Sequence, residues 1–139
     1  MATTTATITL ASTDIADNAL NISNTATFYT AGTDTGITET TGLARKKTNS
    51  GTNTVLLDSG TGVAADVTAD KSAKVYIKNI NDRGDGTKFV TILLTTVEIG
   101  RLYGGDWMLI PWKAAAGKDI EFTASDTTET TLEYAVFYE

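Results

Sequence analysis

The segment KFVTILLT, residues 88–95, decides the fold class of this chain, because it is almost continuously apolar and rich in β-branched side chains. Such a run predicts a central strand that is covered on both faces. The preceding segment AKVYIKNI, residues 73–80, alternates lysine and tyrosine with valine and isoleucine, which is the period of a half-buried strand. Residues 81–86, NDRGDG, are typical of a turn, and Asp85-Gly86 predicts a hairpin between the two strands.

Alternating segments continue from this pair towards both ends of the chain. Residues 107–112, 118–123 and 130–138 are predicted strands, and Pro111 lies near a strand end, where a missing N–H group is tolerated. Threonine accounts for 28 of the 139 residues, and its β-branched side chain fits a pleated, half-exposed surface. The composition therefore favours strands throughout.

The N-terminal part has the same period but fewer large apolar residues. Residues 3–10 alternate threonine with alanine, isoleucine and leucine, and the even-numbered residues of 20–26 share one face. The residues between them, 12–20, predict a short helix or a turn. Residues 1–10 are expected to form an extended N-terminal arm or an edge strand.

Nine or ten short strands joined by Gly, Asn and Asp turns predict an all-β fold, an antiparallel β-sandwich of jelly-roll-like form. We predict a single domain over residues 1–139, because this length suits one domain. The densest core is expected in residues 70–139, since nine of the eleven aromatic side chains lie after residue 75.

The composition excludes several classes of chemistry. The chain contains no cysteine and no histidine, which removes disulfides, thiolate and histidine metal sites, and Ser-His-Asp triads. We predict no catalytic residue, no cofactor and no metal ligand. A net charge of −6, with residues 45–47 as the only basic run, argues against nucleic acid as the main partner. Residues 89–94 are too few to span a bilayer, and residues 1–5 lack the pattern of a signal peptide, so no membrane association is expected.

Two features of the loops and strands leave alternatives open. Residues 83–85 spell Arg-Gly-Asp, which we interpret as a loop tip rather than an adhesion motif. Asn81, Asp82 and Asp85 could offer oxygen ligands to calcium, although their spacing does not follow the EF-hand pattern. Whether this loop binds calcium stays open.

Trp107 and Trp112 lie five residues apart, so on a regular strand they face opposite sides. One of them is expected in the core. The other is expected at a subunit interface, where tryptophan is enriched, or on a surface that stacks against sugar rings.

Three segments carry a family resemblance: residues 73–80, residues 98–112 and residues 131–138. Together they resemble small virion structural proteins of tailed bacteriophages, especially those of marine and cyanobacterial hosts. The resemblance implies a β-sandwich used in a particle, as a capsid decoration or cement protein. It implies the major capsid protein or other virion subunits as partners, a homo-oligomer, with a trimer expected, and location in the virion after assembly in the host cytoplasm. It assigns no catalytic residue.

The interface candidates that follow are Ile8, Leu10, Tyr103, Trp107 and Trp112. The alternatives are a tail, neck or fibre component of the virion and a carbohydrate-binding β-sandwich module, in which an exposed Trp or Tyr stacks on sugar.

Overall fold

The computed structural model describes residues 3–13, 19–30, 32–37, 39–48, 51–58, 73–84, 86, 88–125 and 129–139. These residues belong to two compact units, Met1–Thr38 and Glu39–Glu139. All regular structure in the described part is β-strand, and every strand pairing there is antiparallel. The all-β, antiparallel class predicted from the alternation is confirmed. The helix or turn predicted for residues 12–20 falls mainly on residues 14–18, which lie outside the described residues.

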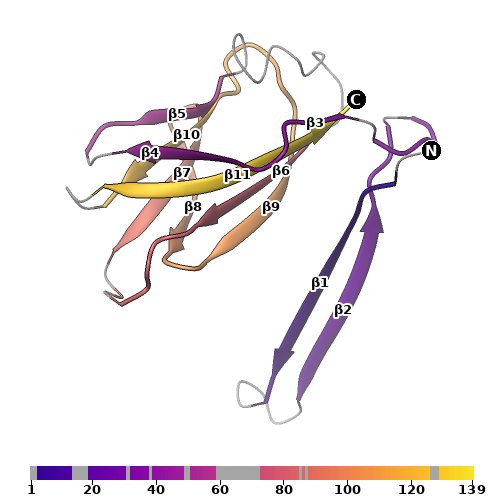
Figure 1. Ribbon diagram of the computed structural model, residues 1–139, viewed down its shortest axis with the longest axis horizontal. Coiled ribbons are helices and arrows are strands. Elements are labelled where there is room, and N and C mark those ends of the chain that lie inside the picture. Colours follow the sequence, from indigo (N-terminus) through magenta and orange to yellow (C-terminus); the bar gives the residue numbers. More distant parts are fainter. Residues whose placement is uncertain are drawn as a thin grey trace. The chain divides into compact units, whose positions relative to one another are not determined.

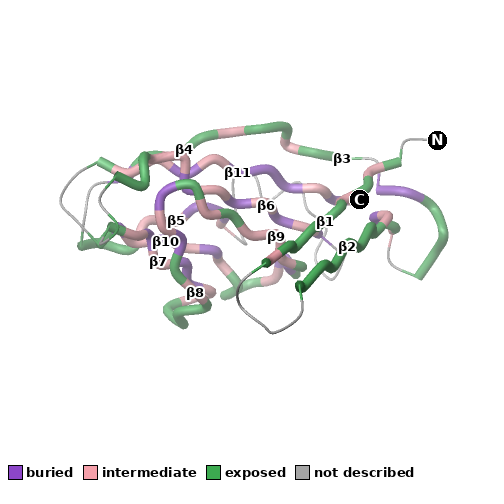
Figure 2. The backbone as a smooth tube through the Cα atoms, turned by 90° about the horizontal axis from the view of Figure 1, so that it is seen from below, coloured by how far each residue is buried: buried purple, intermediate pink, exposed green. Residues whose placement is uncertain are grey.

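The first unit contains one β-hairpin, in which β1 (Thr5–Ser12) pairs with β2 (Leu20–Thr27) (Figure 1). Leu10 lies opposite Ile22, so the even-numbered residues of both strands share one face. At the open end of the hairpin, the Phe28 N–H group donates a hydrogen bond to the Thr4 carbonyl oxygen at 2.9 Å. Almost every residue of the two strands is exposed, as Figure 2 shows.

The second unit contains two antiparallel sheets. The sheet that we call the β7 sheet has the order β5-β10-β7-β8, and the sheet that we call the β11 sheet has the order β3-β11-β6-β9. β4 pairs with the same edge of β11 as β3 does, but nearer the N-terminal end of β11. The bounds are β3 (Glu39–Thr40), β4 (Ala44–Thr48), β5 (Thr54–Leu57), β6 (Ala73–Asn79), β7 (Phe89–Leu94), β8 (Val97–Tyr103), β9 (Trp107–Trp112), β10 (Ile120–Ala124) and β11 (Thr130–Tyr138).

Strands β4 to β11 pair in a nested order: β4 with β11, β5 with β10, β6 with β9 and β7 with β8. The pairs β11–β6 and β10–β7 then complete the two sheets. The chain therefore follows the path of one long hairpin, folded over so that successive pairs fall in alternate sheets. The β7–β8 turn is the tip of that hairpin.

One hydrophobic core lies between the two sheets, a sandwich-like arrangement. It forms because alternate residues of each strand point inward, as in β6, where Val75 and Ile77 are fully buried and Tyr76 is not. The cluster takes side chains from both sheets: Leu56, Leu57, Ala73, Val75, Ile77, Val90, Ile92, Leu102, Trp112, Ala114, Ile120, Phe122, Leu132, Tyr134, Val136 and Tyr138. Most of these residues lie after residue 70, where the densest core was predicted.

Two predictions about the segments around residue 85 need correction. β6 and β7 do not form a hairpin, because β6 pairs with β9 and β11 while β7 pairs with β8 and β10. The loop between them instead crosses from one sheet to the other. β7 is central in its sheet as predicted, but its two faces are not covered equally, since Phe89 and Thr91 are only partly buried while Val90 and Ile92 are fully buried.

Candidate functional site

Four exposed aliphatic side chains of the first unit lie on one face of the β1–β2 hairpin. Ile8 is 37% exposed and Leu10 is 53% exposed, and both were interface candidates from the sequence. The register adds Leu20 and Ile22, each 46% exposed, to the same face. The alternation in residues 20–26 was a signal for these two residues, but only the pairing places them beside Ile8 and Leu10.

The opposite face of the hairpin carries hydroxyl groups. The Thr7 and Thr25 hydroxyls are hydrogen-bonded at 2.8 Å, and the hydroxyls of Thr9 and Ser23 at 3.4 Å. Neither strand contains Asp, Glu, Lys or Arg. The two strands of the hairpin therefore form an uncharged ribbon with one apolar and one hydroxyl-rich face.

The two tryptophans face opposite sides of β9, as predicted. Trp112 is buried in the core, and its Nε1–H group donates a hydrogen bond to the Lys118 carbonyl oxygen at 2.7 Å. Its place among the interface candidates is corrected, because a buried ring offers no surface to a partner. Trp107 is 49% exposed, with its ring 6.4 Å from that of Tyr76. Tyr103 is half-buried, and its ring lies 5.5 Å from that of Phe89.

Trp107 belongs to the outer face of the β11 sheet, where aromatic and charged side chains alternate. The register places Trp107 beside Lys78, and Lys78 beside Glu133. The Arg45 guanidinium forms an ion pair with the Glu133 carboxylate at 3.0 Å. Burial raises the pKa of the Tyr76 phenol, and the negative charge of Glu133 raises it further.

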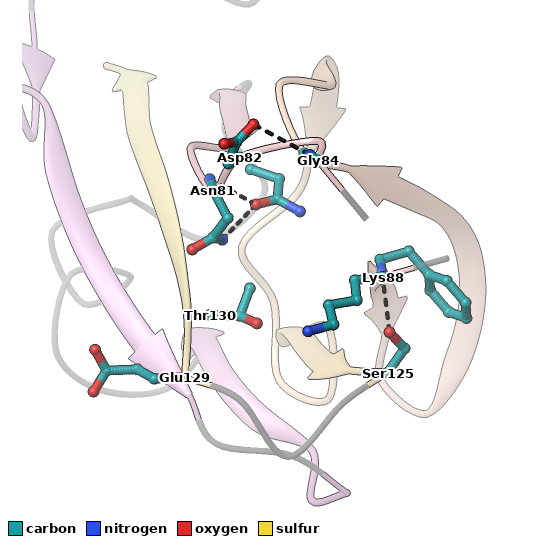
Figure 3. A pocket seen from close by; sticks show the side chains of 10 residues that line it. Asn81, Asp82, Gly84, Lys88, Ser125, Glu129 and Thr130 are labelled. Atoms are coloured by element: carbon teal, nitrogen blue, oxygen red, sulfur yellow. Dashed lines mark hydrogen bonds between the residues drawn. The ribbon is translucent and has the colours of Figure 1, made fainter. Parts of the chain in front are cut away.

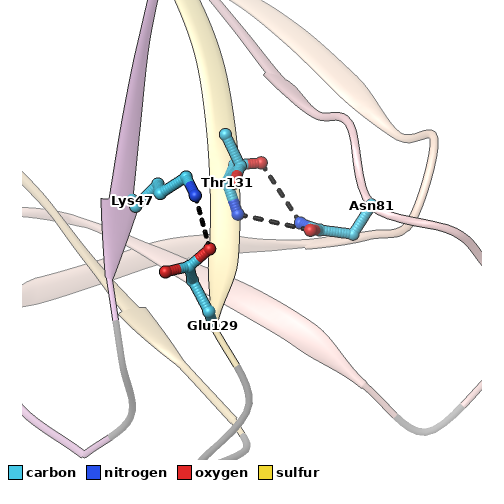
Figure 4. A network of polar contacts seen from close by, with 4 residues as sticks. All are labelled: Lys47, Asn81, Glu129 and Thr131. Atoms are coloured by element: carbon cyan, nitrogen blue, oxygen red, sulfur yellow. Dashed lines mark hydrogen bonds and ion pairs between the residues drawn. The ribbon is translucent and has the colours of Figure 1, made fainter.

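A pocket of about 350 Å³ opens where the β6–β7 and β10–β11 connections meet. Figure 3 shows the Lys88 ammonium and the Thr130 hydroxyl pointing towards each other across it. The Ser125 hydroxyl oxygen accepts a hydrogen bond from the Phe89 N–H group at 2.9 Å. The Glu129 carboxylate, by contrast, points away from the pocket and forms an ion pair with Lys47 at 2.6 Å (Figures 3 and 4).

Asparagine side chains hold the inner wall of this pocket. Asn79 is buried, and its side-chain NH₂ group donates to the Leu102 carbonyl oxygen at 3.0 Å. The Asn79 Oδ1 atom accepts hydrogen bonds from the backbone and side-chain nitrogens of Asn81. The Asn81 amide also bridges to the backbone of Thr131, as Figure 4 shows. The pocket wall is thus tied to both β8 and β11, because Leu102 lies on β8 and Thr131 on β11.

The described residues of the 81–86 loop make structural contacts. The Gly84 N–H group donates to the Asp82 carboxylate at 3.2 Å, and Arg83 forms an ion pair with Asp106 at 3.4 Å. Asp85, which the adhesion and calcium interpretations require, lies outside the described residues. Among the described residues, no group of three or more His, Cys, Asp or Glu side chains could hold a metal ion.

Comparison of the chain with models of known protein families, with curated proteins and with solved structures found no match. In the part of the chain that the structure describes, no helix is long and apolar enough to cross a membrane.

Proposed function

We propose that this protein is a non-enzymatic structural subunit of a virus particle, a decoration or cement protein that binds the assembled capsid. The observation that carries the proposal is the hairpin face formed by Ile8, Leu10, Leu20 and Ile22, which exposes branched aliphatic side chains on a ribbon without charges. Large apolar side chains gathered on one exposed face are typical of surfaces that a partner covers. The resemblance of residues 73–80, 98–112 and 131–138 to phage virion proteins supports the choice of a capsid.

We infer further that the second unit is a jelly roll. Its support is the nested pairing of β4 with β11, β5 with β10, β6 with β9 and β7 with β8, because a jelly roll is a long antiparallel hairpin folded into two sheets. Such a unit presents the outer faces of its two sheets and their edge strands to neighbours.

The mechanism that we propose is multivalent burial of apolar surface. Each copy would contribute modest contacts through Trp107 and through exposed apolar side chains of the hairpin, and many copies on one shell would bind with high avidity. Because the protein would bind the assembled shell better than free shell subunits, it would stabilise the particle by mass action.

The test is quantitative mass spectrometry of purified particles, followed by localisation of the protein in their density map. A decoration protein should be present in fixed proportion to the major shell subunit and lie on the outside of the shell. A few copies per particle at one vertex would assign it to a tail, neck or fibre instead. Absence from particles would overturn the proposal.

A matched pair of variants tests the contact surface. Trp107→Ala should weaken binding to shells stripped of this protein by at least tenfold, because it removes a large exposed aromatic anchor. Val97→Ala, which removes an exposed apolar side chain at the β7–β8 turn, should bind as the unchanged protein does. Equal binding by all three proteins would exclude Trp107 from the contact.

A further inference from the structure

The edge strands of the second unit each carry a feature that hinders pairing with a further strand. β4 contains three consecutive basic residues, Arg45, Lys46 and Lys47, and β3 beside it has only two residues. β9 contains Pro111, which has no N–H group to donate. β5 has only four residues, and the pairings of β5 and β8 both contain a register shift. Charges, proline, short length and bulges protect an edge, so the described edges of this unit are built against adding a strand.

The β1–β2 hairpin of the first unit has edges of the opposite kind. Both strands are eight residues long and contain no charged residue and no proline. Their register runs without a shift from the Thr5–Thr27 pair to the Ser12–Leu20 pair. Among the described strands, β1 and β2 pair only with each other, so each has one edge that no described strand covers. Long, regular, uncharged edges of this kind are the ones that pair with a strand of another chain.

The hydrogen bonds of the hairpin show which backbone groups of β1 point outward. The Phe28 N–H group donates to the Thr4 carbonyl oxygen, so these two residues form a hydrogen-bonded pair. Hydrogen-bonded and non-hydrogen-bonded pairs alternate along an antiparallel ladder, so the even-numbered residues of β1 bond to β2. The odd-numbered residues direct their backbone groups to the open edge: Thr5, Thr7, Thr9 and Ala11.

A second copy of β1 is complementary to this open edge. When β1 pairs antiparallel with itself, the two-fold axis is perpendicular to the ribbon, so the apolar faces of both copies stay on the same side. The two registers with the longest overlap place Thr7 opposite Thr9 of the second copy, or Thr9 opposite itself. Threonine pairs are favourable across strands, and the hairpin already contains one in the Thr7–Thr25 hydroxyl bond of 2.8 Å.

Stability and charge both favour an identical partner. An isolated two-stranded hairpin is marginally stable in water, whereas three or more strands that share an apolar face can be stable. Two copies joined through β1 form four strands, with Ile8, Leu10, Leu20 and Ile22 of both copies on one face. The chain has a formal net charge of −6, and the uncharged strands let two copies meet without bringing like charges together.

Of the two open edges of the hairpin, that of β1 is better suited to pairing. β2 contains Asn21 and Asn24, and asparagine is depleted in strands. β1 contains no asparagine, and its first five residues include four β-branched ones: Thr5, Thr7, Ile8 and Thr9.

We infer that the outward edge of β1 is a self-association site, at which β1 pairs antiparallel with β1 of a second copy of this chain. The inference goes beyond the proposed function and does not depend on it, because it uses the edge of the ribbon and leaves the apolar face free for another partner. The contact consists of a few backbone hydrogen bonds, so by itself it should be weak and concentration-dependent. It becomes effective when other contacts hold several copies close together.

The first test uses the absence of cysteine from the chain, which makes single-cysteine variants unambiguous. Thr9→Cys places a thiol on β1, and Ser23→Cys places a matched thiol directly opposite on β2. Neighbouring strands lie about 4.8 Å apart, so in a β1–β1 pair the two copies of residue 9 lie within about 8 Å, and those of residue 23 at least about 14 Å apart.

A bis-maleimide that spans about 8 Å should therefore cross-link Thr9→Cys into dimers and leave Ser23→Cys monomeric. Preferential cross-linking of Ser23→Cys would assign the contact to β2 and overturn the inference. Equal cross-linking of the two variants, or none of either, would also overturn it.

The second test blocks one edge at a time. Thr7→Pro removes an N–H group that faces the open edge of β1, and Thr25→Pro removes the corresponding group at the open edge of β2. Thr7 and Thr25 lie opposite each other, so both variants lose the same hydroxyl bond and keep the backbone hydrogen bonds between β1 and β2. A difference between the two variants therefore reports on the edge that is used.

Sedimentation velocity of the full-length chain over a range of concentrations gives the readout. Thr7→Pro should weaken self-association at least about tenfold, while Thr25→Pro should leave it unchanged. Equal effects of the two variants, or a wild-type chain that stays monomeric at the highest attainable concentration, would overturn the inference. A wild-type oligomer that Thr7→Pro leaves intact would overturn it as well.

Discussion

Gly104 lies directly against the backbone of Asp82. A Cβ atom on residue 104 would lie 2.6 Å from the Asp82 carbonyl oxygen and 2.7 Å from the Arg83 nitrogen. Both of these are backbone atoms, so they cannot turn aside as a flexible side chain would. The close approach holds the β6–β7 loop against the β8–β9 turn at the wall of the pocket.

Replacing Gly104 with alanine should therefore destabilise the second unit by about 1–3 kcal/mol, the usual cost of forcing extra atoms into a packed site. Gly100→Ala is the matched control, because nothing lies within 4 Å of a Cβ placed there. Alanine at residue 100 should be neutral or stabilise by up to about 1 kcal/mol, since glycine weakens a strand. Urea unfolding of both variants checks the difference, and equal midpoints would contradict the close approach.

The buried Asn79 amide is expected to contribute to stability through its hydrogen bonds. Asn79→Ala removes the donor to the Leu102 carbonyl oxygen and the acceptor for Asn81, and should cost about 1–3 kcal/mol for the groups left unpaired. Asn53→Ala serves as the control, because the Asn53 side chain is exposed and its hydrogen bonds to Glu121 and Thr123 lie at the surface, so its loss should cost less than about 1 kcal/mol. The free energies of unfolding of the two variants, measured side by side, test this ranking.

The two tryptophans should behave differently in every assay that reports burial. Trp112→Ala should cost about 3–5 kcal/mol of stability, while Trp107→Ala should cost less than about 1 kcal/mol. Acrylamide should quench the fluorescence of a Trp112→Phe variant, in which Trp107 remains, far more than that of a Trp107→Phe variant. Similar quenching of the two would contradict their placement on opposite faces of β9.

The raised pKa of Tyr76 predicts a loss of stability at alkaline pH. The unfolded chain releases this proton near pH 10, while the folded chain retains it to a higher pH because the phenol is partly buried and lies near Glu133. The folded state then binds more protons than the unfolded state, so the contribution is fully present below pH 10 and is lost as the pH rises through the folded-state pKa.

Tyr76→Phe should accordingly make the decline of stability above pH 10 shallower, as measured by urea unfolding at a series of pH values. Glu133→Gln should recover a smaller part of the stability that is lost above pH 10, since the Glu133 charge is the lesser cause of the raised Tyr76 pKa. Parallel pH profiles of Tyr76→Phe and the unchanged protein would show that this phenol does not contribute.

The β7–β8 turn contains a removable source of strain. Thr95 and Thr96 have φ angles of +44° and +67°, a conformation that β-branched residues rarely adopt. A hydrogen bond offsets part of the strain at Thr95, because the Thr95 hydroxyl donates to the Gly117 carbonyl oxygen at 2.6 Å. Thr96→Gly should raise stability by about 0.5–1 kcal/mol, the relief of strain less the entropy that glycine adds to the unfolded chain. Thr95→Gly, which also loses the hydrogen bond, should gain less, and calorimetry can rank the two.

The strands could be predicted because alternation is a local property. Val75 and Ile77 were placed inside and Tyr76 outside from residues 73–80 alone, and the structure agrees. The partners of each strand were not predictable in the same way. Asp85-Gly86 indicated a hairpin between β6 and β7, but each of these strands pairs with other strands. Turn residues indicate where the chain bends, and they do not specify which strands pair on either side of the bend.

The residues of the candidate surfaces were likewise predictable from the sequence only in part. Ile8 and Leu10 could be selected from their spacing, whereas Leu20 and Ile22 joined them only through the antiparallel register. The pocket had no sequence signal, because its lining residues Asn79, Lys88, Gly104 and Ser125 come from different strands and loops.

By itself, the order of amino acids determined that this protein is built of antiparallel strands whose residues alternate between two faces, and that cysteine and histidine chemistry is absent. These follow from side-chain period and composition, which act over a few neighbouring residues. Only the tertiary structure decided that Trp112 is buried and Trp107 exposed, that the chain doubles back in nested pairs, and that four aliphatic side chains form one face. Those outcomes depend on contacts between residues far apart in sequence, which no local pattern specifies.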